Sequence, residues 1–162
     1  MVLECNQFFL EMVAMSKRKV ASEEPCPVAR SVDLVGDRWT LLIVRDAFGG
    51  LRRFSEFQRN LGVARNILSD RLRRLVDTGI LRTQAASNGD AHQEYVLTAR
   101  GRDLFPVVVA LRQWGERCLF REGEPHSELV EKSTGRPLQR MEPRAASGQA
   151  LAPDEAQVRK LA

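Results

Sequence analysis

The hydrophobic positions between residues 66 and 78 repeat with the period of an α-helix. Leucines at i, i+4 and i+7 fall on one helix face, which predicts that this face is buried: Leu68, Leu72 and Leu75. A shorter helix is expected just before it. That helix begins at Ser55, which forms a Ser-x-x-Gln capping box with Gln58, and Gly62 marks the turn that follows.

The hydrophobic period changes after Gly79, a glycine typical of the position that follows a helix end. Residues 80–83 and 93–97 flank the sequence Ser87-Asn88-Gly89-Asp90. Asn-Gly between two such runs predicts a β-hairpin, because both central residues of a type I′ turn need a positive φ. A short helix, a turn, a second basic helix and a hairpin form the layout of a winged helix-turn-helix, whose second helix fits the major groove of DNA.

Helices are also predicted before this unit. Pro27 suits the first turn of a helix that ends at Gly36, because the N–H that proline lacks is not needed there. Asp37 then caps a helix from Arg38 to about Ala47. Since this second helix is apolar on most sides, we expect it at the centre of the core.

A long helix is predicted after the hairpin, with Thr98 as its N-cap and its end near Phe120. Pro106 lies inside it and is expected to kink the helix or to mark its true start. A domain this small has little left to cover such a helix, so we expect a homodimer, with an intramolecular core as the alternative. The expected interface residues are Val28, Val32, Leu104, Val108, Leu111 and Trp114.

The predicted fold class is therefore mainly α with a small β-hairpin (α+β), a winged helix-turn-helix that dimerises through its N- and C-terminal helices. Residues 1–25 are expected to form a flexible arm and residues 26–120 the DNA-binding and dimerisation domain. Residues 121–162 form a C-terminal extension with short strands at 129–130 and 137–138. Its tail is expected to be partly disordered, or to form a weak helix at Asp154–Leu161.

Composition narrows the class of protein. The chain of 162 residues is 43% hydrophobic and 28% charged, which suits a globular domain with extensions, and its net charge of +4 hints at nucleic acid. No apolar run approaches the roughly 20 residues that span a bilayer. Three cysteines without a Cys-x-x-Cys spacing argue against a disulfide scaffold and a zinc site, so we expect no metal, no cofactor, no membrane partner and a cytoplasmic protein.

Six short motifs follow one another along the chain: Cys26-Pro27-Val28, Gly36-Asp37-Arg38-Trp39-Thr40-Leu41-Leu42-Ile43, Arg53-Phe54-Ser55-Glu56-Phe57, Leu68-Ser69-Asp70-Arg71-Leu72, Gly79-Ile80-Leu81 and Tyr95-x-Leu97-Thr98-x-x-Gly101. Between about Cys26 and Phe120 the chain therefore resembles the HxlR-type regulators, bacterial transcription factors allied to the MarR group. The resemblance implies a homodimer on near-palindromic double-stranded DNA, and a cysteine at position 26 that senses oxidants or electrophiles, as in some members. Residues 85–92 depart from the proline-containing wing of many members, and residues 121–162 exceed the shortest ones.

The leucine stripe fixes the buried side of the 66–78 helix, so the DNA-binding candidates are Asn66, Ser69, Arg73 and Arg74 on its opposite face, with Arg65 just before the helix. Asn reads adenine and Arg reads guanine in the major groove, and a solvated polar face is the alternative. Asp70 is expected to orient Arg73 or Arg74, and Arg71 to form a structural ion pair.

Further candidates for DNA contact surround the hairpin and the shorter helix. Asn88, Gly89 and His92 of the wing are candidates for backbone or minor-groove contact, and Arg82 for a phosphate contact. Arg52 and Arg53 lie beside the N-terminus of the shorter helix, itself a potential anion site. Ordinary surface solubility is the alternative for all of them.

Cys26 occupies an N-cap-like position, where a helix N-terminus favours a thiolate; an inert buried cysteine is the alternative. The expected function is sequence-specific DNA binding by a repressor or activator that responds to redox state through Cys26. A winged-helix protein–protein interaction module and a regulator gated by an unknown small-molecule effector remain alternatives. An enzyme is not expected, because both histidines are isolated and no nucleophile–base spacing or phosphate loop is present.

Overall fold

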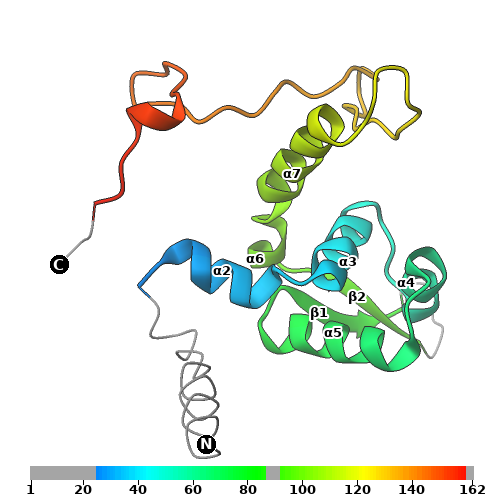
Figure 1. Ribbon diagram of the computed structural model, residues 1–162. Coiled ribbons are helices and arrows are strands. Elements are labelled where there is room, and N and C mark those ends of the chain that lie inside the picture. Colours follow the sequence, from blue (N-terminus) through cyan, green and yellow to red (C-terminus); the bar gives the residue numbers. More distant parts are fainter. Residues whose placement is uncertain (1–24, 87–91, 160–162) are drawn as a thin grey trace, which may run out of the picture. The chain divides into compact units, whose positions relative to one another are not determined.

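The computed structural model describes residues 25–86 and 92–159 (Figure 1). The expected N-terminal arm and the Asn88-Gly89 turn lie outside the described residues. The chain divides into two compact units, of which the first ends at Arg102 and the second begins at Asp103.

The first unit contains the helix-turn-helix and the hairpin (Figure 1). Its elements are α2 (Pro27–Val35), α3 (Arg38–Phe48), α4 (Phe54–Leu61), α5 (Arg65–Asp77), β1 (Leu81–Ala85), β2 (Gln93–Leu97) and α6 (Ala99–Arg102). The central position expected for α3 is confirmed, because α3 contacts α4, α5 and β2 and fully buries Ile43 and Val44. Phe57 of α4 and the leucine stripe of α5 complete this core. The arrangement is a winged helix-turn-helix.

The predicted cap of α3 is confirmed. The Asp37 carboxylate accepts the backbone N–H groups of Trp39 and Thr40 at 3.0 and 3.1 Å, and it also accepts the Thr40 hydroxyl. These donors satisfy N–H groups that have no partner within the helix. The start of α3 is therefore fixed at one carboxylate.

The predicted start of α4 at Ser55 is wrong. The helix begins at Phe54, and Glu56 closes its first turn by accepting the backbone N–H groups of Arg52 and Arg53 at 2.8 and 2.9 Å. These two donors hold the pKa of Glu56 below its usual range. A carboxylate is a stronger acceptor than a hydroxyl or an amide at the positive end of a helix, so it displaces the expected Ser-x-x-Gln box. The Glu56 carboxylate therefore binds the two N–H groups that immediately precede the helix.

The turn between α4 and α5 depends on Gly62, as predicted. Gly62 has φ of 61° in the left-handed region, and its N–H donates to the Gln58 carbonyl at 3.0 Å. A side chain would be strained in this conformation, which is why glycine suits it. α5 then ends as expected, with the N–H groups of Gly79 and Ile80 bonded back to Val76 and Leu75, both at 2.9 Å.

The hairpin pairs β1 and β2 antiparallel, with Leu81 opposite Leu97 and Thr83 opposite Tyr95. The first strand starts one residue later than predicted. The N–H of Tyr95 also donates to the Arg52 carbonyl at 2.8 Å, so the segment before α4 runs beside β2. This bond brings the Arg52–Arg53 pair to the base of the wing.

The single long helix predicted from Thr98 to Phe120 is wrong, because the chain forms α6 and then α7 (Phe105–Cys118). Thr98 does cap the first of these, accepting the Gly101 N–H at 3.1 Å. Pro106 lies in the first turn of α7, where its missing N–H breaks no helical bond. Of the two outcomes expected for Pro106, it marks the start of the terminal helix and does not kink a longer one.

The segment after α7 is irregular. The short strands expected at 129–130 and 137–138 reduce to one antiparallel bridge between Val130 and Pro137. Near the C-terminus, a 3-10 turn, η2 (Pro153–Glu155), stands where a weak helix was expected. Polar contacts hold this extension against one side of α7.

Two side chains of α7 make these contacts. Arg112 donates to the Ser127 hydroxyl at 2.8 Å. Gln113 donates to the Gln139 carbonyl at 3.0 Å and accepts the Met141 N–H at 2.8 Å. The Gln113 amide thus binds the backbone of the extension at two positions, through both its donor and its acceptor, and anchors it to the helix.

Candidate nucleic-acid interface

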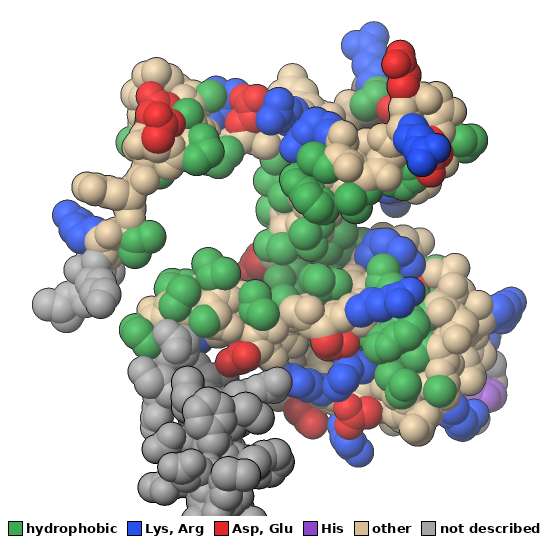
Figure 2. All heavy atoms as spheres, viewed as in Figure 1, with side chains coloured by type: hydrophobic (Ala, Val, Ile, Leu, Met, Phe, Trp, Pro, Cys, Tyr) green, Lys and Arg blue, Asp and Glu red, His purple; other side chains and the backbone are tan. Residues whose placement is uncertain are grey.

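The leucine stripe of α5 is fully buried, and the candidate side chains are exposed. Leu68 and Leu72 have no exposed surface and Leu75 has 2%. All five predicted residues of this helix are exposed, namely Arg65, Asn66, Ser69, Arg73 and Arg74. Figure 2 shows basic and acidic side chains next to each other over the edge of the first unit that α5 forms.

Arg65, Arg73 and Arg74 are each held by a different neighbour. The Arg65 guanidinium stacks over the Phe54 ring of α4, 5.1 Å from its centroid, which directs it along the helix-turn-helix. Arg73 pairs with Asp70 at 2.7 Å, as predicted. Arg74 instead donates to the Asp33 carbonyl of α2. Arg74 is therefore bound to the backbone near the corner between α2 and α3, and in this it differs from the other four candidates of α5.

A chain of alternating charges joins the cap of α3 to α5. Arg71 pairs with Asp37 at 3.1 Å and with Asp70 at 3.0 Å, and this confirms the structural ion pair predicted for Arg71. Burial tends to raise the pKa of Asp37, but the hydrogen bonds from Thr40, the Arg71 charge and the Trp39 N–H outweigh it and hold that pKa below its usual range. Asp37 thus remains ionised as both a helix cap and an ion-pair partner.

One residue of this face was missed by the sequence reasoning. Ile67 is 38% exposed on α5, between Asn66 and the buried Leu68. An exposed aliphatic side chain at this place suits the methyl group of thymine. The available signal was its position, because Ile67 lies one residue before the leucine stripe and so about 100° away from it.

The basic residues around the hairpin are placed unequally. Arg82 is exposed on β1, His92 is exposed just before β2, and Arg53 is half-buried at the cap of α4. Asn88 and Gly89 lie outside the described residues. Glu94, which was also missed, is buried on β2 with its carboxylate 3.8 Å from Arg52. This acid ties Arg52 to the wing.

Cys26 is exposed at the N-cap of α2 rather than buried in a core. Val28 and Val32, two and six residues further along, are exposed as well. The helix therefore presents a thiol and two apolar side chains outside the core of its unit.

The second unit has an apolar stripe of its own. Val107, Leu111, Trp114 and Cys118 follow the helical spacing i, i+4, i+7, i+11 along α7, and all are exposed. Leu104 and Val108, also expected at an interface, are half-buried. The side of α7 that carries Arg112 and Gln113 is the one held by the extension.

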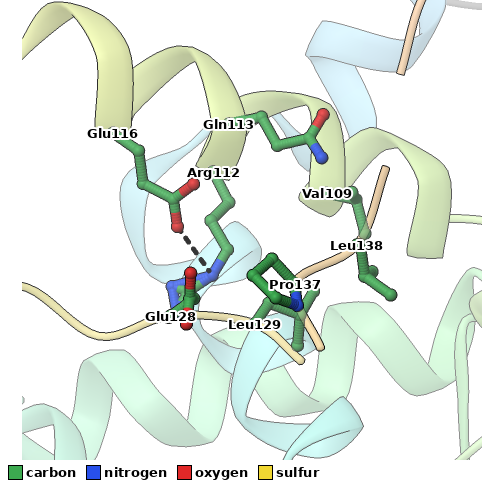
Figure 3. A pocket seen from close by; sticks show the side chains of 8 residues that line it. All are labelled: Val109, Arg112, Gln113, Glu116, Glu128, Leu129, Pro137 and Leu138. Atoms are coloured by element: carbon green, nitrogen blue, oxygen red, sulfur yellow. Dashed lines mark ion pairs between the residues drawn. The ribbon is translucent and has the colours of Figure 1, made fainter. Parts of the chain in front are cut away.

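A small cavity lies between α7 and the extension (Figure 3). Its volume is about 50 Å³, and the Arg112–Glu116 ion pair at 3.5 Å crosses its wall. Ligand pockets for drug-sized molecules measure about 300–1,000 Å³, so this cavity has room only for water. It is too small for an organic effector.

A helix-turn-helix whose second helix exposes polar and basic side chains, followed by a hairpin, defines the winged helix-turn-helix class of DNA-binding proteins. Within residues 25–86 and 92–159, no helix is long and apolar enough to cross a membrane.

Known proteins place the chain more closely. The model of the HxlR-like helix-turn-helix family matches residues 34–122. An uncharacterised HTH-type transcriptional regulator from Mycobacterium tuberculosis is 47% identical over 108 residues, which make up 67% of this chain and 68% of the relative. The chain belongs to the HxlR-like helix-turn-helix family, and it is a transcriptional regulator of the helix-turn-helix type.

Solved structures agree with this assignment. The crystal structure of PA1607, a candidate transcription factor, has a TM-score of 0.81 at 51% identity and covers 85% of this chain and 96% of PA1607. The redox regulator HypR in its reduced form has a TM-score of 0.52 at 32% identity, covering 56% of this chain and 91% of HypR. The likeness to PA1607 thus extends well beyond the helix-turn-helix.

We expect Asp37 to make the stability of the first unit sensitive to acid. A lowered folded-state pKa stabilises the fold above the carboxyl's ordinary pKa of 3.8, and this contribution is lost as the pH falls through the folded value. Asp37→Ala should cost about 0.5–2 kcal/mol near neutral pH and less in acid. Urea unfolding between about pH 7 and pH 3 measures this, with Asp77→Ala, at an exposed aspartate of α5, as control. Equal losses at both pH values would contradict the assignment.

Proposed function

We propose that the protein is a sequence-specific DNA-binding regulator that inserts α5 into the major groove and acts as a repressor or activator. The observation that carries this proposal is the row of exposed polar side chains opposite a fully buried leucine stripe. A helix that docks on another protein would carry apolar residues on that face, and α5 has only Ile67 there. This favours DNA over the protein–protein module.

The residues of α5 differ in their proposed roles. Asn66 and Arg73 are assigned to base edges, because a side-chain amide and a guanidinium match adenine and guanine. Ser69 and Arg65 are assigned to phosphates. Arg74 would have to leave the Asp33 carbonyl to reach DNA, so we place it outside the base-reading group.

Around the wing, Arg53 and Arg82 are proposed to contact phosphates. The wing residues Asn88, Gly89 and His92 are assigned to the backbone or minor groove. Arg52 is proposed in the same role, and its guanidinium lies 3.8 Å from the buried Glu94 carboxylate of the wing.

Replacing either base-reading residue should weaken cognate binding more than nonspecific binding. Asn66→Ala or Arg73→Ala is expected to cost about 1–3 kcal/mol on a duplex that the unmodified protein selects from a random library, and much less on random DNA. Arg136→Ala, which removes one charge from the extension, is the control. Equal losses of affinity on the selected duplex and on random DNA would show that the residue contacts only phosphate.

We also propose that the active form is a homodimer on a near-palindromic operator. The support is the exposed stripe of α7, especially Leu111 and Trp114, together with Val28 and Val32 on α2. Large exposed apolar patches mark interaction sites. A twofold dimer would present two α5 helices to half-sites about 34 Å apart.

A charged residue in the stripe of α7 should prevent dimer formation. Leu111→Glu or Trp114→Glu is expected to give a monomer, because a carboxylate would lose its hydration in the interface. Sedimentation equilibrium measures the mass, and Arg136→Glu on the extension should remain dimeric. A well-folded monomer of the unmodified chain at micromolar concentration would overturn the proposed assembly.

We propose, finally, that Cys26 makes the regulator respond to oxidants or electrophiles. The exposed thiol at the cap of α2 supports this, as does the 32% identity with the redox regulator HypR. A disulfide to the partner subunit, or modification of the thiol, would shift α2 and with it the spacing of the two α5 helices. Coupling of about 1–3 kcal/mol is typical of such switches.

Diamide treatment tests Cys26. The reagent takes up the two electrons and two protons that two thiols release when they join as a disulfide. The unmodified protein should lose about 5–150-fold in DNA affinity, whereas Cys26→Ser should bind normally and ignore the reagent. Cys118→Ser should still respond. If the protein keeps its full affinity for DNA after complete oxidation of Cys26, the proposed sensor role is wrong. A small-molecule effector would then be the remaining alternative for controlling DNA binding.

A further inference from the structure

We propose that Asp37 and Arg71 are positioning residues that fix the direction in which Arg73 approaches the DNA bases. This inference rests on the proposed function, in which α5 lies in the major groove. It adds a determinant of sequence preference that contacts no DNA itself, because Asp37 belongs to the cap of α3.

Asp70 is the link between the two ends of this network. Its two carboxylate oxygens serve different guanidinium groups, with Arg71 on Oδ2 at 3.0 Å and Arg73 on Oδ1 at 2.7 Å. Arg71 in turn places Nε 3.1 Å from Asp37. Each inner charge therefore restrains the next one outward, in the order Asp37, Arg71, Asp70, Arg73.

The two outer side chains of this network are more exposed than the two inner ones. The exposed fraction is 32% for Asp37 and 28% for Arg71, then 49% for Asp70 and 71% for Arg73. Water screens the outer pair most, so the pair of Asp70 and Arg73 alone would hold the guanidinium weakly. The inner pair is better shielded and supplies the restraint.

Asp37 can serve as the fixed end because its carboxylate does not turn freely. It accepts two backbone N–H groups at the start of α3 as well as the Thr40 hydroxyl. α3 is the central helix of the unit, with Ile43 and Val44 fully buried. The orientation of Arg73 is therefore fixed relative to the hydrophobic core, through Asp37 at the start of α3. It does not depend on the surface of α5 alone.

The presence of Asp70 on a DNA-facing helix supports this role. A carboxylate repels phosphate, so it weakens electrostatic attraction to every duplex alike. A guanidinium held in one direction, however, matches the two acceptors of guanine and fits the other bases poorly. The network therefore lowers the affinity for all DNA but increases the preference for the cognate sequence over others.

Asp37→Asn separates positioning from capping. An asparagine oxygen still accepts the N–H groups of Trp39 and Thr40, its nitrogen can donate to the Thr40 hydroxyl oxygen, and Asn and Asp are equally good N-caps, but the negative charge that pairs with Arg71 is removed. Asp33→Asn is the matched control, since it makes the same change of charge at an exposed site at the end of α2. Arg71→Lys is the second variant, because lysine keeps the charge but cannot bridge two carboxylates through separate nitrogens.

The measurement compares affinities for three probes. These are the duplex that the unmodified protein selects from a random library, single base-pair variants of that duplex, and random DNA. Asp37→Asn and Arg71→Lys should lower the ratio of selected to variant affinity about three- to thirtyfold, with random-DNA affinity unchanged or higher for Asp37→Asn. A merely structural role would instead lower all affinities together.

A double variant completes the test. Asp37→Asn combined with Arg73→Ala should discriminate no worse than Arg73→Ala alone, because the restraint acts only through that guanidinium. Losses that add independently, or an unchanged ratio in both Asp37→Asn and Arg71→Lys, would overturn the inference while leaving DNA binding intact. A protein that selects no duplex at all would overturn the proposed function and this inference with it.

Discussion

The burial of three leucines on one side of α5 determines both the core and the candidate DNA-binding face. Leu68, Leu72 and Leu75 are almost completely shielded from water, and full burial of each stabilises the fold by about 1.5–3 kcal/mol. Because successive residues of a helix differ by about 100°, the same contacts fix which side chains point outward. Turning α5 by one residue would expose a leucine and bury an arginine, so the hydrophobic core sets the orientation of the polar face.

Packing fixes the helix, but the ends of long arginines need further restraints. Asp37 and Asp33 lie on either side of the corner between α2 and α3, and each is bonded to an arginine of α5. Arg71 reaches the Asp37 carboxylate and Arg74 the Asp33 carbonyl. A displacement of this corner would therefore act on α5 through two adjacent turns of the helix. Cys26 occupies the N-cap position at the other end of α2.

Local signals in the sequence were sufficient for most of the first unit. Asp37 caps the helix it was expected to cap, Gly62 adopts a left-handed turn, and the leucine stripe is buried. Each of these depends on residues within a few positions of one another. At α4 two local signals competed, and the sequence alone did not reveal that the Glu56 carboxylate would displace the box expected at Ser55.

Contacts between distant parts of the chain could not be read in this way. Arg74 and Asp33 are 41 residues apart, and Arg71 and Asp37 are 34 apart. No periodic pattern links such pairs, so the sequence placed Arg74 with the DNA-binding residues by its helical angle alone. For Arg71 the sequence predicted a structural ion pair, yet it did not name Asp37 as the partner.

In the second unit, too, contacts between distant residues decide which side of α7 is covered. Its apolar residues recur with helical period, yet Val109 is buried while Leu111 and Trp114 are exposed. The difference arises because Arg112 and Gln113 bind the backbone and hydroxyl groups of a segment that begins beyond the end of the helix. Two polar side chains of α7 thus determine which side of this helix the C-terminal extension covers. The apolar stripe with Leu111 and Trp114 remains exposed, and periodicity alone could not distinguish the two sides.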